Sequence, residues 1–148
     1  MKKLVLSLFI GVSLTLTNSA MSQDMKKPSF NLDQAYTQEQ ITQMETQAKN
    51  YILSLVPLGS DVQTALTTLK EHVSKDVDYN HNNGITLPEK TAKARGISGQ
   101  LGVQSIKVLV AKTEKPKVPA ISYLYVFLGF DATGKLIAVE PITEIDAI

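Results

Sequence analysis

Oxygen-bearing side chains recur at a regular spacing between residues 78 and 89. They occupy the first, third, fifth, ninth and twelfth places of that segment and belong to Asp78, Asn80, Asn82, Thr86 and Glu89. A hard cation such as Ca²⁺ takes about six to eight oxygen ligands that converge from a tight turn. The spacing therefore makes these residues a candidate Ca²⁺ site.

This segment resembles the EF-hand loop, since Ile85 supplies the hydrophobic residue of its eighth place. It departs from the EF-hand pattern at the sixth place, where Asn83 stands instead of glycine. Only Asp78 and Glu89 carry charge, which predicts weak binding. The alternative interpretation is an Asn-rich turn whose side-chain amides bond to its own backbone.

Other reactive residue types form no catalytic pattern. The two histidines, His72 and His81, lie in neither HxxxH nor HExxH spacing, and His72 suits the last turn of a helix. No serine lies in GxSxG or SxxK, and there is no cysteine. We therefore expect a non-enzymatic protein without a cofactor, Ca²⁺ being the one exception considered.

The N-terminal residues have the composition of a secretory signal peptide. Lys2 and Lys3 precede an apolar run at residues 4–16, and Ala20 and Ser22 supply small side chains for cleavage. We expect residues 1–22 to be the signal peptide, cut near Ser22, and the protein to be periplasmic or secreted.

The composition of the mature chain limits its partners. Cleavage leaves 148 − 22 = 126 residues with 13 basic and 14 acidic side chains, a formal charge of −1. A chain without a basic excess is not expected to bind nucleic acid. No second long apolar run follows, so no membrane span is expected in the mature chain.

Two amphipathic helices are predicted after a flexible leader at residues 23–36. Thr37 and Gln40 form a capping box at the start of the first helix, and Pro57 and Gly59 end it. Ser60 begins the second helix in the same way. The predicted buried faces are Ile41, Met44, Ala48, Tyr51, Ile52 and Leu55, then Val62, Ala65, Leu66, Leu69 and Val73.

Three strands are predicted in the second half of the chain, at residues 105–112, 122–130 and 136–142. Gly134 suits a hairpin turn between the last two. Residues 76–102 are expected to be the least regular part, with a turn at Asn80, Asn82, Asn83 and Gly84 and a short helix considered with Pro88 in its first turn. The predicted fold is a single α+β domain over residues 37–148, in which two N-terminal helices pack on a small, mainly antiparallel three-stranded sheet.

Two short patterns resemble exported bacterial domains of the SmpA/OmlA type and β-lactamase-inhibitor-like proteins. The first runs from Leu58 through Gly59-Ser60-Asp61-Val62 to Leu66, and the second from Tyr125 through Phe130-Asp131 to Gly134-Lys135-Leu136. The resemblance implies a fold of two helices followed by three strands and a protein-binding habit. It transfers no functional residue.

The sequence thus predicts an exported, non-enzymatic protein whose macromolecular partner is another protein. An inhibitor or immunity protein is the form considered. The sheet's open face or residues 76–102 would bind it, with Tyr79 and Tyr123 as exposed aromatic candidates. The alternative is weak binding of a cation or small molecule by the loop from Asp78 to Glu89.

Overall fold

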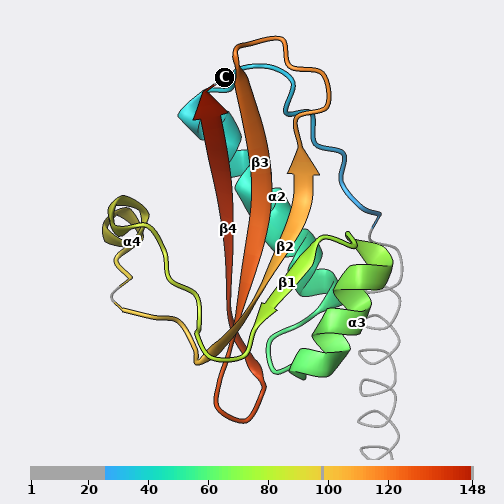
Figure 1. Cartoon of the computed structure of the whole chain (residues 1–148), viewed down its shortest axis with the longest axis vertical. Helices are drawn as coiled ribbons and strands as arrows, with labels where there is room; N and C mark the ends of the chain where they lie inside the picture. The colour runs from blue at the N-terminus through green and yellow to red at the C-terminus, as the bar shows by residue number, and fades with distance from the viewer. Residues whose placement is uncertain (1–25, 98, 148) are drawn as a thin grey trace, which may run out of the picture.

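The computed structural model describes residues 26–97 and 99–147 of this chain. They form an α+β fold with three helices and one four-stranded antiparallel sheet of order β1-β2-β3-β4 (Figure 1). The signal peptide expected at residues 1–22 lies outside the described residues. The elements are α2 (Gln38–Leu55), α3 (Val62–His72), β1 (Val77–Asn80), α4 (Glu89–Arg95), β2 (Gln104–Lys112), β3 (Ala120–Phe130) and β4 (Leu136–Ala147).

The start of α2 is as predicted, whereas the start of α3 is not. Thr37 and Gln40 form the capping box of α2 through reciprocal side-chain to backbone hydrogen bonds. At α3 the N-cap is Asp61, whose carboxylate accepts the backbone N–H of Gln63 at 3.0 Å. The prediction of Ser60 was wrong, because the Ser60 hydroxyl donates to the Pro57 carbonyl and is not available to the helix.

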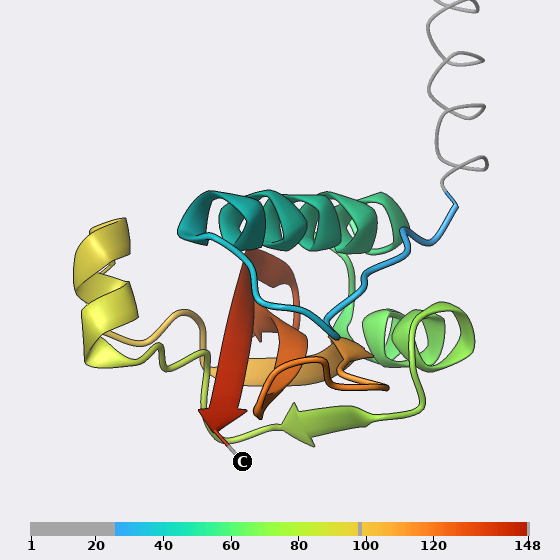
Figure 2. The same cartoon turned by 90° about the horizontal axis from the view of Figure 1, so that it is seen from above.

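Both N-terminal helices bury their apolar faces against one face of the sheet. Ala48 and Ile52 of α2 and Ala65 and Leu69 of α3 are fully buried in one cluster with the alternate residues of β2 and β3. Figure 2 shows α2 lying across this side of the sheet with α3 beside it. The opposite side, which we call the outer face, carries the other set of alternate side chains.

The sheet has four strands in the described residues, and the prediction of three was wrong. The additional strand, β1, pairs with β2 in antiparallel register, with Val77 opposite Val108. A third helix, α4, lies between β1 and β2, so the helices do not all precede the sheet. Both elements fall within residues 76–102. α4 is the short helix considered there, with Pro88 as its N-cap, whereas β1 was not predicted. Val77 and Tyr79 of β1 alternate with exposed polar residues, but four residues are too few for that alternation to predict a strand, so pairing with β2 defines it.

The segment after β1 folds back over part of the outer face. Ile85 and Leu87 are buried there against Ile142 of β4, in a cluster separate from the main core. Ile85 and Leu101 exchange two backbone hydrogen bonds, 2.9 and 3.0 Å long. Gly84 permits this contact, since a Cβ atom there would lie 2.2 Å from the Gly102 carbonyl oxygen. Parts of residues 81–97 and 99–102 are therefore packed onto the sheet.

The described part of the expected leader, residues 26–36, forms no helix or strand but is packed against the domain. Leu32 is buried in the main core, and its carbonyl accepts the Thr113 hydroxyl at 3.0 Å. The Asp33 carboxylate accepts the backbone N–H groups of Glu114 and Lys115, each at 2.8 Å. These contacts join the leader to the loop between β2 and β3.

The hairpin between β3 and β4 has the predicted turn. Gly134 has a φ of +78°, which favours glycine, and its N–H donates to the Asp131 carbonyl at 3.0 Å. The Asp131 carboxylate accepts backbone N–H groups from Lys135 and Thr133 as well as the Thr133 hydroxyl. These hydrogen bonds, that from Lys135 first, hold the pKa of Asp131 below its ordinary value.

Candidate functional site

Three aromatic side chains of β3 line up on the outer face of the sheet. Tyr123, Tyr125 and Phe127 are alternate residues, so their side chains share one side of the strand. The rings of Tyr123 and Tyr125 are stacked, with centroids 5.9 Å apart and planes at 15°. Phe127 is tilted by 58° against Tyr125, with centroids 6.5 Å apart. The three rings form a continuous aromatic stripe.

Lys107 of β2 and Glu144 of β4 complete this surface, and we call the five residues the tyrosine face. The Lys107 ammonium lies 3.8 Å from the ring centroid of Tyr125 and 5.5 Å from that of Phe127. The same nitrogen lies 4.0 Å from a Glu144 carboxylate oxygen. An ammonium over an aromatic face is attracted by the ring quadrupole, so the tyrosine face already holds one cation.

Further carboxylates lie around the tyrosine face. Glu144 is opposite Tyr123 in the register of β3 and β4, and Asp78 is opposite Lys107 in that of β1 and β2. Burial raises the pKa of Tyr125, and the nearby charges of Glu144, Asp76 and Asp146 raise it further. Several carboxylates therefore lie close enough to Tyr125 to act on its hydroxyl.

One end of the aromatic stripe is covered and the other is open. Phe127 packs against the cluster of Ile85, Leu87 and Ile142, beneath the segment that carries α4. Tyr123 and Tyr125 lie farther toward the start of β3 and remain half-exposed. In Figure 1, α2 lies behind the sheet, and no described helix lies in front of the upper part of β3 and β4.

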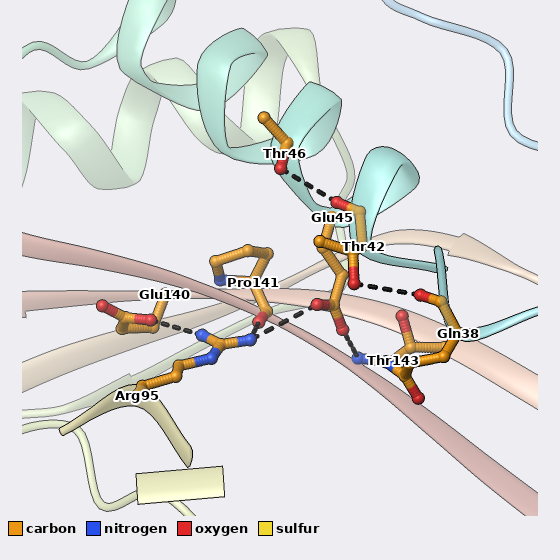
Figure 3. A network of polar contacts seen from close by, with 8 residues as sticks. All are labelled: Gln38, Thr42, Glu45, Thr46, Arg95, Glu140, Pro141 and Thr143. Atoms are coloured by element: carbon orange, nitrogen blue, oxygen red, sulfur yellow. Dashed lines mark hydrogen bonds and ion pairs between the residues drawn. The ribbon is translucent and has the colours of Figure 1, made fainter. Parts of the chain in front are cut away.

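A charged network fixes α4 beside β4 (Figure 3). Arg95, at the end of α4, donates to Glu45 of α2 at 3.3 Å and to the Pro141 carbonyl at 2.9 Å, and it also pairs with Glu140. Arg95 as a whole is exposed, but its side chain is only 28% exposed. The side chains of Glu45 and Glu140 are 15% and 16% exposed. This partial burial strengthens the charge-assisted hydrogen bonds.

The same network covers the backbone at the edge of the sheet. Within the described residues β4 has a neighbouring strand, β3, on one side only. On its other side the Glu45 carboxylate accepts the Thr143 N–H at 2.9 Å, and Arg95 donates to the Pro141 carbonyl. Pro141 itself has no N–H to leave unpaired. These side chains occupy the groups that another strand would pair with, so this stretch of the edge is blocked.

The candidate Ca²⁺ residues are only partly brought together. Asp78, Asn80 and Thr86 line one cleft of about 460 Å³, whereas Asn82 and Glu89 do not line it. The side-chain amide oxygen of Asn80, Oδ1, accepts the backbone N–H groups of Asn82 and Asn83 at 3.0 and 3.1 Å. This is the geometry of the Asn-rich turn considered as the alternative.

The same cleft also contains a positive charge, because Lys107 lines it together with Asp78. An ammonium in the cleft opposes the entry of a divalent cation. Among the residues that the structure describes, no three His, Cys, Asp or Glu side chains are grouped so as to hold a metal ion.

The histidines and Tyr79 have other surroundings. His72 lies in the last turn of α3, as predicted, with its ring 3.9 Å from the Glu71 carboxylate. The ring of His81 lies 6.0 Å from that of Tyr79. Tyr79 is half-buried, as is Tyr123, but it packs against the main core and its hydroxyl bonds to Gln104, so it does not belong to the tyrosine face.

The sequence pointed to Tyr123 but not to the rest of the tyrosine face. The alternation of Tyr123, Tyr125 and Phe127 within a predicted strand was a usable signal, since alternate residues share a face. Lys107 and Glu144 join them through strand register, which no local pattern shows.

None of the described helices combines the length and the apolar character that crossing a bilayer requires. The chain matches no protein-family model, no curated protein and no solved structure.

Proposed function

We propose that this protein is an exported, non-enzymatic protein that binds another protein through the tyrosine face. The observation that supports this most is the stacked pair of Tyr123 and Tyr125, half-exposed on a part of the sheet that no described helix covers. Tyrosine is enriched in protein interfaces, because its ring adds contact area at low entropic cost and its hydroxyl still bonds to water or a partner.

The rigid support of this surface favours recognition without rearrangement. Tyr123 and Tyr125 alternate with Leu124 and Val126, which are fully buried in the main core. The backbone that carries the rings is paired on both sides, with β2 and with β4. A pre-organised aromatic surface loses little conformational entropy when a partner binds.

The expected export of the chain determines where it would meet its partner. The signal peptide expected at residues 1–22 would release a mature chain into the periplasm or the medium, where the partner would be met. An inhibitor or immunity protein that blocks another exported protein is the form we favour. The proposed likeness to SmpA/OmlA-type and β-lactamase-inhibitor-like domains agrees with this form.

Site-specific photocrosslinking tests the proposal. A photoreactive amino acid replaces Tyr123 in the full chain, and in a matched control it replaces Leu58, an apolar residue that is 63% exposed in the turn before α3. In the native host we expect one dominant protein adduct from position 123 and none from position 58. No adduct at position 123, or the same adducts from both positions, would refute the proposal.

A second proposal is weak Ca²⁺ binding in the cleft of Asp78, Asn80 and Thr86, favoured by the fact that one cleft gathers these three oxygen-bearing side chains. Titration calorimetry of the full chain with millimolar Ca²⁺ tests it. If the cleft binds Ca²⁺, Lys107→Gln should strengthen binding, because it removes the ammonium. No heat with either protein would end this proposal.

A further inference from the structure

We infer that the tyrosine face recognises a basic segment of its protein partner, one whose arginine side chains lie over the tyrosines and pair with the surrounding carboxylates. This inference depends on the proposed function and names the chemistry of the partner. The arrangement of Lys107 and the balance of charge around the face support it.

Lys107 shows which chemistry the face accommodates. Its ammonium lies over the ring of Tyr125 at 3.8 Å and 4.0 Å from Glu144. The protein thus satisfies one cation with an aromatic ring and a carboxylate at the same time. Tyr123 and Glu144, which are opposite each other in the register of β3 and β4, offer the same pair of groups to a cation from outside.

The charges around the face are unbalanced in favour of a cationic partner. Two ammonium groups and four carboxylates lie on or around the face, which gives a formal charge of 2 − 4 = −2. The ammonium groups belong to Lys107 and Lys112, and the carboxylates to Asp76, Asp78, Glu144 and Asp146. The carboxylate of Glu144 is 47% exposed at the side chain and remains accessible. Such a surface attracts basic segments and repels phosphates, so it disfavours a nucleic acid.

Arginine fits this surface better than lysine. A guanidinium group is planar, stacks on an aromatic ring and donates two parallel hydrogen bonds to a carboxylate, whereas an ammonium is a compact and strongly hydrated charge. The stacked rings of Tyr123 and Tyr125 present flat surfaces of this kind beside Glu144. We therefore assign arginine as the main contact residue of the partner.

Binding of synthetic peptides to the full chain tests the inference. Three peptides of equal length, rich in arginine, glutamine or glutamate, are titrated while the backbone amide signals are followed by NMR. We expect the arginine peptide to bind about ten-fold more tightly than the glutamine peptide, a difference of about 1.4 kcal/mol. Its largest shifts should fall on Lys107, Tyr123, Tyr125 and Glu144. The glutamate peptide should not bind.

Charge reversal supplies the matched variants. Glu144→Lys should weaken binding of the arginine peptide about ten-fold, and Glu144→Gln by a smaller factor. Glu71→Lys, a control at a carboxylate that is 67% exposed at the end of α3, should leave it unchanged. Thermal unfolding of each variant checks that it is folded.

Three results would overturn the inference. These are equal binding of the arginine and glutamine peptides, no binding of either, and an effect of Glu144→Lys no larger than that of Glu71→Lys. Failure of the inference can be separated from failure of the proposed function. If position 123 still crosslinks its protein partner in the Glu144→Lys background with undiminished yield, the protein binds a partner there but does not recognise a basic segment of it.

Discussion

Arg95 is the residue whose replacement should most clearly show how α4 is held to the sheet. Its guanidinium contacts α2 through Glu45 and β4 through Glu140 and the Pro141 carbonyl. Arg95→Met keeps much of the length of the side chain but removes all of these hydrogen bonds. It also leaves Glu45 and Glu140, whose side chains are 15% and 16% exposed, without their cation.

The expected loss follows from the number and burial of these bonds. A buried hydrogen bond to a charged group contributes about 1.5 to 3 kcal/mol, whereas an exposed ion pair contributes about 0.2 to 1 kcal/mol. The Arg95 side chain is 28% exposed, and the contact with Glu45 is long at 3.3 Å. We therefore expect Arg95→Met to lower the free energy of unfolding by about 2 kcal/mol, or the melting temperature by about 6 to 10 °C.

Urea unfolding of the full chain measures this loss, and amide hydrogen exchange locates it. Exchange should accelerate most at residues 85–97, which connect α4 to the sheet, and at Thr143 on the edge of β4. Lys93→Met, a control on the same helix at an exposed position, should change stability by less than about 0.5 kcal/mol. Equal losses from Arg95→Met and Lys93→Met would show that the network is an ordinary surface pair.

Three other perturbations test separate contacts. Asp33→Ala removes the acceptor of two N–H groups at 2.8 Å and should lower the free energy of unfolding by about 1 to 2 kcal/mol. Amide exchange should become faster at residues 113–117, and unchanged exchange there would contradict the contact. Gly84→Ala places a Cβ atom 2.2 Å from the Gly102 carbonyl oxygen and should lower the free energy of unfolding by more than about 2 kcal/mol in urea unfolding. A free energy equal to that of the wild type would contradict this close approach. The pKa of Tyr125 is raised above 10.0 by burial and then by Glu144. The contribution of the neutral hydroxyl to stability is complete below pH 10.0 and is lost as the pH rises through the pKa of the folded state. The free energy of unfolding should therefore fall less with rising pH in Tyr125→Phe than in the wild type. Identical pH curves for the two proteins would argue against the raised pKa.

The parts of the fold that were predictable are those whose interactions are local. The capping box of Thr37 and Gln40 joins residues three apart, and the turn at Gly134 depends on one backbone angle. The buried faces of α2 and α3 follow from the spacing of apolar residues along each helix. Each of these features can be evaluated within a few residues of sequence.

The predictions that failed concern competition between distant groups. Ser60 and Asp61 are both good N-caps, and the choice fell to Asp61 because the Ser60 hydroxyl bonds to Pro57 and its carbonyl accepts the Leu136 N–H. β1 is too short for its alternation of Val77 and Tyr79 to predict a strand, and it exists through its pairing with β2. The Leu136 contact and the pairing with β2 both involve residues far from the segment concerned.

The residue pattern alone predicts the two amphipathic helices, the β-rich second half and the alternation of Tyr123 and Tyr125. The position of Lys107 over Tyr125 beside Glu144 depends on the three-dimensional fold, as does the contact of Arg95 with two carboxylates separated from it by 45 and 50 residues. Charges and rings interact over separations of a few ångströms in space, whatever the number of residues between them along the chain. The register of the strands and the path of the segment around α4 set those separations, and both arise from packing across the whole domain.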